Sequence, residues 1–415
     1  NECGHQVANW AVVSYKSAPW YSQGVQYSNP LIANLYDRPD GKKQAVLVTS
    51  AGSLSVLDSN AAVLWSKILH LPGNNSPSCA PMDAERSGRP CVFIPAESQQ
   101  RVYAFAYDGR TLAGWPTGSN YRFIKVAASI ADANLDGSPE IVAGDECCYV
   151  FSWNPTGDWK KTGTAESSFL WRNLTGSSST TIYGTTTAIG DLDNDADHIP
   201  DVVLGSNHST ALFAFPGDAW GDFISHPLYL TGFPKAAGAR VETSPAVGDL
   251  DGDGLNDIAV GSSDGKLYIG LASENHLMRG YDTGGPVKSS PALYDLDGDG
   301  KLDVIVGSDS GRLCAFNWLG QAPEGWGQGI KLSSATDYQI ESSPVVGDVT
   351  GDGVPEIVVG CNDGNVYAVY KDGMNHSENG SLTSPIAWVR CCVPISKTSA
   401  KVLATPVIDD IDGDG

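Results

Sequence analysis

The sequence predicts an all-β protein and, within that class, a β-propeller of four-stranded blades. Three observations predict it. A unit of roughly 45–60 residues recurs along the chain, which is the length of one propeller blade. Each unit contains short apolar runs rich in β-branched residues, which favour strands and are too short for helices. Glycine is abundant, with 47 residues among 415, as expected for many tight turns.

The elements of one unit follow in a fixed order, as residues 289–316, SSPALYDLDGDGKLDVIVGSDSGRLCAF, illustrate. An apolar strand comes first, then an acidic loop, then a strand that ends in Val-Gly. A turn such as SDG or NDG leads into a third strand such as KLYIG or NVYAVY, since Asp-Gly between alternating strands is a strong hairpin signal. We expect a fourth, less regular strand in each remainder, for example around residues 284–288 or 329–334.

The acidic loop of this unit has Asp295, Asp297 and Asp299 at alternate positions, and Asp303 follows four residues later. Carboxylates this close repel one another unless a cation neutralises them. Calcium accepts such a set, with carboxylates at loop positions one, three, five and nine and a backbone carbonyl at position seven, here Lys301. The loop therefore predicts a calcium site between the first two strands of the blade.

The same pattern recurs in other units of the chain. Loop 191–201 reaches its last acid two residues late, and the pattern at 410–414 stops before its later positions. The predicted ligands in these loops are Asp132, Asn134, Asp136, Ser138 and Glu140; Asp191, Asp193, Asp195, Asp197 and Asp201; Asp249, Asp251, Asp253, Leu255 and Asp257; Asp348, Thr350, Asp352, Val354 and Glu356; and Asp410, Asp412 and Asp414.

Two units nearer the N-terminus lack a complete loop, and their anchors lie near Asp37 and Asp83. With them, repeat anchors fall near residues 37, 83, 132, 191, 249, 295, 348 and 410. We expect a single propeller domain over residues 1–415 with eight blades, and seven as the alternative. The last blade is truncated at the C-terminus, and we expect residues 9–15 to supply the outer strand of the blade that residues 404–409 open.

The repeated loops resemble those of the FG-GAP or VCBS repeat proteins, the propellers of integrin α-subunits and of many secreted microbial proteins. The resemblance rests on an Asp-x-Asp-x-Asp-Gly-x-x-Asp/Glu loop followed by a Val-Gly strand, at 132–140, 249–257, 295–303 and 348–356, and it extends over nearly the whole chain. It implies four or more bound calcium ions, mainly structural, and a role in adhesion, ligand binding or scaffolding. The integrin resemblance favours seven blades.

The charge of the chain excludes one class of partner. With 26 basic and 48 acidic residues the formal charge is −22, whereas nucleic-acid binding needs a basic surface. Bound calcium would remove about two units of negative charge at each occupied site. No apolar run approaches the ~20 residues that span a bilayer. We therefore expect no nucleic-acid partner and no membrane span in this segment.

The nine cysteines show no zinc-binding spacing. In the unit near Asp83, Cys79 and Cys91 flank the incomplete loop, so we expect a disulfide there in place of calcium, with thiols or other pairings as the alternative. The other disulfide candidates are the adjacent pairs Cys147 and Cys148, and Cys391 and Cys392, and Cys3 is the candidate for the odd thiol. Disulfides and calcium sites of this kind both indicate an extracellular protein.

Glycosylation sequons give weaker support for that location, and they begin at Asn74, Asn173, Asn207, Asn375 and Asn379. His198 lies inside an acidic loop, where it either orients a ligand or is a surface residue. Tryptophans near glycine-rich loops form either a sugar-binding platform or packing between blades, namely Trp115, Trp153, Trp159, Trp318 and Trp326.

The favoured function is an adhesion or interaction scaffold whose partner is a protein or glycan of the cell surface or matrix. The sequence contains no Gly-x-Ser-x-Gly elbow, no HExxH and no glycine-rich phosphate loop, so we expect no enzyme. Two alternatives stay open: a lectin-like carbohydrate-binding propeller, and a carbohydrate-active enzyme such as a polysaccharide lyase or hydrolase, which could use one of the many carboxylates as its acid or base.

Overall fold

The computed structural model of the 415-residue chain describes most of the repeat region. The chain falls into two compact units whose boundary lies within β12, and residues from Val407 onward belong to the first unit. We call them the N-terminal and C-terminal units. The described residues are 29–48, 52–69, 76–81, 89–96, 101–118, 127–132, 135, 137–144, 149–153, 169–172, 185–195, 197–205, 210–217, 229–332, 338–349, 351–374, 386–391 and 401–412.

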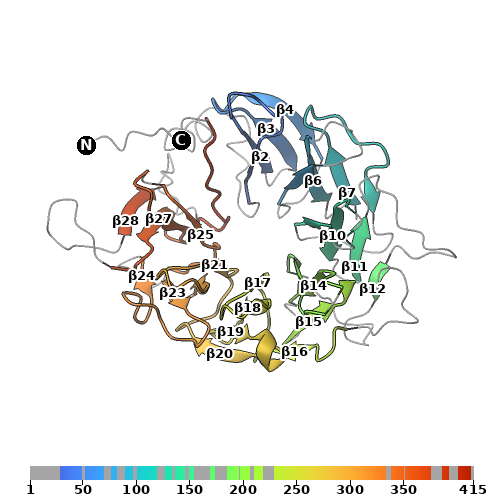
Figure 1. The fold of residues 1–415 in the computed structure, drawn as a ribbon. Helices are drawn as coiled ribbons and strands as arrows, with labels where there is room; N and C mark the ends of the chain where they lie inside the picture. The colour runs from blue at the N-terminus through green and yellow to red at the C-terminus, as the bar shows by residue number, and fades with distance from the viewer. Residues whose placement is uncertain are drawn as a thin grey trace. The chain divides into compact units, whose positions relative to one another are not determined.

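Four-stranded sheets with strands in sequence order make up the N-terminal unit up to β12 (Figure 1). Neighbouring strands run antiparallel, as where Val46 of β2 pairs with Val56 of β3. The strands are β1 (Leu31–Ala33), β2 (Gln44–Val48), β3 (Ser53–Leu57) and β4 (Val63–Ile68); β5 (Ser78–Pro81), β6 (Pro90–Ala96), β7 (Arg101–Phe105) and β8 (Thr117–Gly118); and β9 (Ser129–Ala131), β10 (Glu140–Gly144), β11 (Tyr149–Trp153) and β12 (Phe169–Arg172).

The C-terminal unit has four further sheets of the same kind. Their strands are β13 (Ala188–Gly190), β14 (Asp201–Leu204), β15 (Ala211–Phe215) and β16 (Lys235–Ala236); β17 (Ala246–Gly248), β18 (Asp257–Gly261), β19 (Lys266–Gly270) and β20 (Arg279–Asp282); β21 (Ala292–Tyr294), β22 (Asp303–Gly307), β23 (Arg312–Phe316) and β24 (Ile330–Lys331); and β25 (Val345–Gly347), β26 (Glu356–Gly360), β27 (Asn365–Tyr370) and β28 (Ile386–Cys391). A 3-10 helix, η5 (Ala272–Glu274), follows β19.

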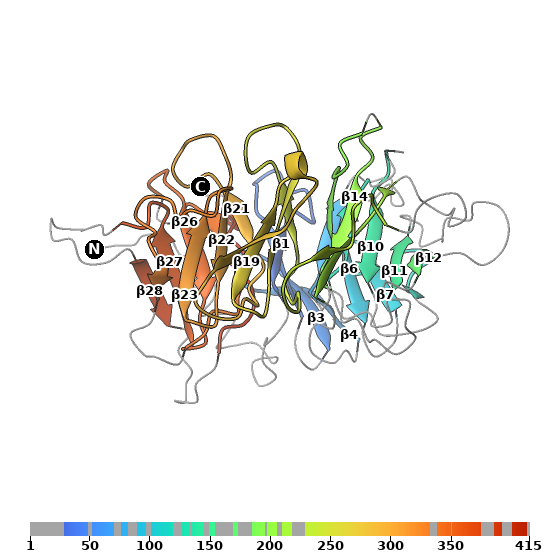
Figure 2. The same cartoon turned by 90° about the horizontal axis from the view of Figure 1, so that it is seen from below.

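Within this unit the first strands of consecutive sheets, β13, β17, β21 and β25, lie beside one another. Figure 2 shows β21, β22 and β23 side by side in one of these sheets. The second strand of each sheet is buried on both faces, as the run Asp303–Gly307 illustrates. In β17–β20 and β21–β24 both faces are covered because each of these sheets packs between two neighbours, and the apolar layers between consecutive sheets form the core of this unit.

The predicted order of elements within a unit is confirmed for the first three strands and their loops. The fourth strand expected around 329–334 is β24, but the one expected around 284–288 is wrong, because β20 ends at Asp282. The described residues form seven four-stranded sheets. The eighth blade stays a prediction, since residues 9–15 lie outside the described part and 404–409 form no strand. Among the described residues, no helix has the length and apolarity needed to span a membrane.

The disulfide expected between Cys79 and Cys91 is wrong, and the strand register explains why. Cys79 of β5 is paired with Val92, and Cys91 of β6 is paired with Ala80. Paired residues project to the same face and successive residues to opposite faces, so the two sulfurs lie on opposite faces of the sheet. Both remain thiols, as do the described Cys314 and Cys361. Cys3, Cys147, Cys148, Cys392 and the side chain of Cys391 lie outside the described part.

A glycine at or just after the end of the second strand makes the contact between neighbouring sheets in the C-terminal unit. A Cβ added at Gly307 would lie 2.3 Å from Ile340 Cγ2, and one added at Gly261 would lie 2.3 Å from Val287 Cγ1. The same contact joins Gly205 to Val241 and Gly360 to Val402. A β-branched side chain from the segment after each sheet therefore fills the notch that the glycine leaves.

Hydrogen bonds fix the same junction. The N–H of Gly307 donates to Ser289 Oγ at 3.1 Å, and the N–H of Ile340 donates to the carbonyl of Ser308 at 3.1 Å. Equivalent bonds to a hydroxyl are donated by Gly205, Gly261 and Gly360, whose acceptors are Thr185, Thr243 and Ser342. The Val-Gly ending that marks the repeats in the sequence is thus required by packing between sheets.

We expect Gly307→Ala to lower the free energy of unfolding by about 1–3 kcal/mol, because the methyl group overpacks the junction. Urea unfolding measures the change. Ile340→Ala removes the side chain that the new methyl group would meet, so in the double variant the two losses should be less than additive. Additive losses would contradict a direct contact between the two positions.

Candidate metal centre

Each acidic loop between residues 132 and 356 joins the first strand of a sheet to the second, and its first carboxylate is held by the loop's own backbone. In loop 295–303, Asp295 Oδ1 accepts the N–H of Gly298 at 2.7 Å, and Asp295 Oδ2 accepts the N–H of Gly300 at 3.0 Å. Asp249 and Asp348 accept the same pair of N–H groups in their loops. Gly298 and Gly300 have φ angles of 80° and 84°, a conformation that favours glycine.

The acid at position nine starts the second strand and is buried. Asp303 Oδ2 accepts the N–H of Leu296, at position two, at 3.0 Å. The same bond runs from Leu250 to Asp257 at 2.9 Å and from Val349 to Glu356 at 3.1 Å. This carboxylate therefore ties the start of the loop to the start of the next strand, whether or not it also binds a metal.

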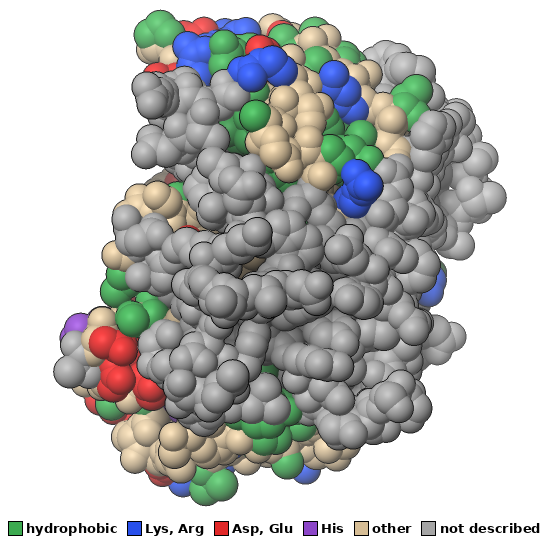
Figure 3. Space-filling view, turned by 90° about the vertical axis from the view of Figure 1, so that its right-hand side faces the viewer, with side chains coloured by type: hydrophobic (Ala, Val, Ile, Leu, Met, Phe, Trp, Pro, Cys, Tyr) green, Lys and Arg blue, Asp and Glu red, His purple; other side chains and the backbone are tan. Residues whose placement is uncertain are grey.

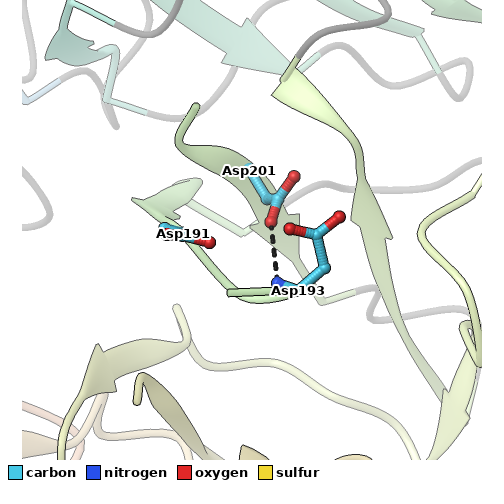
Figure 4. Close-up of side chains that lie close together, drawn as sticks. All are labelled: Asp191, Asp193 and Asp201. Carbon is cyan, nitrogen blue, oxygen red and sulfur yellow. Dashed lines mark hydrogen bonds between the residues drawn. The ribbon is translucent and has the colours of Figure 1, made fainter. Parts of the chain in front are cut away.

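Among the described residues, three loops bring carboxylate oxygens together tightly enough to share one cation. In each, three carboxylates offer oxygens that all lie within 4.8 Å of one another. Oxygen donors at this separation fit a hard divalent cation. The clusters are Asp191, Asp193 and Asp201; Asp249, Asp251 and Asp257; and Asp295, Asp297 and Asp299. Figure 4 shows the first of them, with Asp201 projecting from β14 toward the loop.

Loop 191–201 keeps this arrangement although its last acid comes two residues late. Asp201 Oδ2 accepts the N–H of Leu192 at 2.8 Å, as the ninth residue does in the other loops. The loop has two more residues than the others, and His198 within it has a φ of 53°. His198 Nδ1 lies 3.0 Å from Asp191 Oδ2 and its side chain is 76% exposed, so this surface residue also contacts a predicted ligand.

Burial makes the ionised form of these acids costly. Burial raises the pKa of Asp201 to about 7, with repulsion from Asp193 adding to it and backbone hydrogen bonds opposing it. Burial, and then repulsion from the carboxylates of its own loop, raises the pKa of Asp303 to about 6 against a backbone hydrogen bond. The pKa of Asp257 is also raised, first by burial. A cation at the cluster would offset this cost.

The remaining predicted ligands are described only in part. In loop 132–140, the N–H of Gly137 donates to Asp132 Oδ2 at 2.8 Å and Glu140 is buried at the start of β10, but Asn134 and Asp136 lie outside the described part. The same holds for Thr350 and Asp414. Asp195, Asp253 and Asp352 lie at position five of their loops and are exposed. Figure 3 shows one place on the surface where acidic side chains gather.

The first sheet contains a residue that the sequence did not single out. Gln44 begins β2 and is fully buried, and its Oε1 accepts the N–H of Leu35 at 2.8 Å and that of Tyr36 at 3.2 Å. It therefore occupies the place of the ninth acid. The loop then starts at Asn34 and not at Asp37. The only signal was the position of Gln44 directly before the apolar run of the second strand.

The tryptophans pack in the core where they are described. Trp115, Trp153 and Trp326 are at most 6% exposed, which favours the packing interpretation over a sugar platform. Trp318 is half-buried against the apolar cluster between β17–β20 and β21–β24, and Trp159 lies outside the described part.

Four-stranded antiparallel sheets in sequence order, with acidic loops between the first two strands, define a β-propeller type of repeat protein. The model of the FG-GAP-like repeat matches residues 193–260 and 295–359. These two stretches are thus FG-GAP-like repeats, and the resemblance seen in the sequence is confirmed.

No curated protein matches the sequence significantly. Among solved structures, BBS1N in complex with ARL6DN, soaked with lead, is similar in fold, with a TM-score of 0.50 and 12% identity over 84% of this chain and 90% of that chain. BamB from Moraxella catarrhalis has a TM-score of 0.45 and 14% identity over 80% of this chain and 77% of that chain. At this identity the first similarity shows the fold alone.

The two kinds of acid in a loop should respond differently to substitution. Asp257 accepts backbone N–H groups with both oxygens, from Leu250 and from Ala272 at 2.7 Å, so Asp257→Asn leaves one buried donor unpaired. We expect a loss of about 1–3 kcal/mol in the free energy of unfolding even in EDTA. Asp253→Asn is the control, because exposed Asp253 accepts only through Oδ1, and its stability in EDTA should not change.

Leu135 stands where the other loops have glycine or asparagine. Its φ is 55° and its side chain is 52% exposed, so it carries backbone strain with little burial in return. We expect Leu135→Gly to raise the free energy of unfolding by about 0.5–1 kcal/mol. Glycine relieves the backbone strain, and the greater entropy that it gives the unfolded chain offsets part of this gain. Asn194→Gly should gain less, because asparagine tolerates this conformation and Asn194 Nδ2 donates to Leu192. Thermal unfolding of both variants tests this.

Proposed function

We propose that the protein is an extracellular propeller whose loops bind calcium as a structural ion and whose surface serves as an adhesion or interaction scaffold. The observation that carries the proposal is the set of acidic clusters, each with carboxylate oxygens within 4.8 Å of one another. Unneutralised carboxylates at that separation destabilise the loop, and one divalent cation would reverse the effect.

The donor set fits calcium better than a transition metal. The clusters contain only carboxylates, without the imidazole or thiolate that zinc and copper prefer. In loop 295–303, Asp295, Asp297 and Asp299 would hold the ion, with the carbonyl of Lys301 as the further ligand expected from the spacing. Bound calcium would fix a long exposed loop between a half-buried strand and a buried one. That role is structural, and it asks for no chemistry at the ion.

The extracellular location rests on calcium supply. Sites of this kind in extracellular modules bind at 10⁻⁴–10⁻³ M, and so fill where calcium is near millimolar. Disulfides do not add to this argument, because the described cysteines Cys79, Cys314 and Cys361 are thiols. The predicted sequons all lie outside the described part, so glycosylation stays a prediction.

The proposed role is non-catalytic, with a protein or glycan of the cell surface or matrix as partner. The similar BBS1N chain was crystallised in complex with ARL6DN, so a fold of this type can present a surface to a protein. A glycan array tests the lectin-like alternative, and release of unsaturated or reducing sugar ends from polysaccharides tests the enzyme alternative. A positive result in either assay would replace the scaffold proposal.

Calcium dependence gives a direct test. We expect excess EDTA to lower the melting temperature, since an ion that binds only the folded state stabilises it by about 2.7 kcal/mol per site at a hundredfold excess over Kd. Isothermal titration calorimetry of the chelator-treated protein should find at least four ions, from the loops at 132, 249, 295 and 348. A melt that EDTA leaves unchanged would contradict the proposal.

Substitution assigns one ion to one loop. Asp297→Ala should remove one ion from the calorimetric stoichiometry and leave the others, because the loops belong to separate sheets. Glu324→Ala is the matched control, since Glu324 is an exposed acid between β23 and β24, outside every acidic loop. Loss of several ions in Asp297→Ala would show instead that the sites form one cooperative set.

A further inference from the structure

The backbone of Lys301 belongs to loop 295–303, and its side chain approaches the preceding acidic loop, 249–257. Its N–H donates to Asp299 Oδ1 at 2.8 Å, which fixes its backbone at position seven of loop 295–303. Its side chain extends toward loop 249–257, where Cγ and Cε lie 3.5 and 3.6 Å from the point that a Cβ of Gly252 would occupy.

The two loops are held beside each other by packing. Their first strands, β17 and β21, are neighbours, and Gly248 at the end of β17 has Leu293 and Leu302 of the next sheet against it. A Cβ at Gly248 would lie 2.9 Å from Leu293 Cδ1 and 3.2 Å from Leu302 Cδ1. Lys301 precedes Leu302, so its place over loop 249–257 is set by this junction.

The charge of Lys301 acts on the carboxylates of that loop. Its Cε lies 3.6 Å from the point that a Cβ of Gly252 would occupy, and Nζ is one bond further, so the ammonium group lies beside the backbone between Asp251 and Asp253. The same ammonium Nζ lies 4.8 Å from the centre of the Trp318 ring, in a cation–π contact. Lys301 is thus placed between an acidic cluster and an aromatic ring.

Position seven of the other acidic loops holds no cation. It is Ser138, Asp197, Leu255 or Val354, and Val354 is 44% exposed. An apolar residue at position seven brings no positive charge to the carboxylates of the preceding loop. The cluster of Asp249, Asp251 and Asp257 therefore has a tethered cation that comes from the neighbouring loop.

We propose that Lys301 lowers the calcium affinity of the neighbouring loop 249–257, by acting as a built-in counter-charge that Trp318 holds beside that loop. The inference rests on the proposed function, since it concerns the affinity of one of the proposed sites. The ammonium group stabilises the ion-free loop and repels the incoming divalent cation, so both effects weaken calcium binding there.

The test is a calcium titration of chelator-treated protein by calorimetry. In Lys301→Met, which keeps the aliphatic stem and removes the charge, we expect the Kd of loop 249–257 to fall roughly three- to tenfold at low salt, with less change at high salt. Lys301→Arg keeps the charge and should leave Kd near that of the wild type. Lys331→Met removes an exposed charge on β24, away from the acidic loops, and controls for net charge.

Two further measurements assign the effect. In an Asp251→Asn background, which weakens loop 249–257, Lys301→Met should no longer change calcium binding. The part of the tryptophan fluorescence that Trp318→Phe removes should respond to calcium in the wild type and not in Lys301→Met. A structural role of Lys301 alone would move neither readout.

The outcomes separate this inference from the proposed function. If the wild type binds calcium and Lys301→Met binds it with the same affinities, the inference is overturned and the calcium-stabilised propeller stands. If the wild type binds no calcium at loop 249–257, both are overturned. A rise in affinity that persists in the Asp251→Asn background would place the effect elsewhere and also contradict the inference.

Discussion

The hydrogen bond between the second residue of the loop and the side chain that opens the second strand is the interaction on which five of the described sheets depend. It closes a loop of nine or more residues against the sheet, and it places the first carboxylate over the glycines of the turn. In the first sheet Gln44 makes the bond without any charge. This hydrogen bond therefore occurs in loops with and without an acidic cluster, so it does not depend on the proposed metal site.

Most of the repeat could be predicted from the sequence because its signals are local. The loop spacing, the Val-Gly ending and the Asp-Gly turn each define a short backbone conformation, and the strands Asp303–Gly307 and Asn365–Tyr370 follow from them. The expected fourth strand at 284–288 was wrong because Val287 there fills the notch at Gly261. An apolar residue between strands can belong to packing between sheets, and no local pattern distinguishes the two roles.

The sequence predicted the charged residues of the candidate sites, but it did not reveal Gln44, the neutral residue at the equivalent position of the first sheet. Asp295, Asp297 and Asp299 meet as their spacing requires, and Asp201 reaches its place despite the longer loop. Gln44 carries no charge and recurs in no motif, so its position before the apolar run was the only signal in the sequence, and its buried contacts identify it. The disulfide at Cys79 and Cys91 failed for a different reason: spacing along the chain placed both on one hairpin, but the face of each side chain depends on the strand register.

The glycine at the end of each second strand is covered by a residue that follows the last strand of the sheet, so the structural repeat extends beyond that strand. Gly360 is covered by Val402, which follows β28 and precedes the next acidic loop, so the piece that completes one sheet comes after its last strand. A designer who recombines such repeats should therefore cut the chain beyond that covering residue and not between sheets. A module cut at the sheet boundary would leave the apolar side of its second strand uncovered at the glycine. A module extended to Ala404 would include the covering residue, Val402.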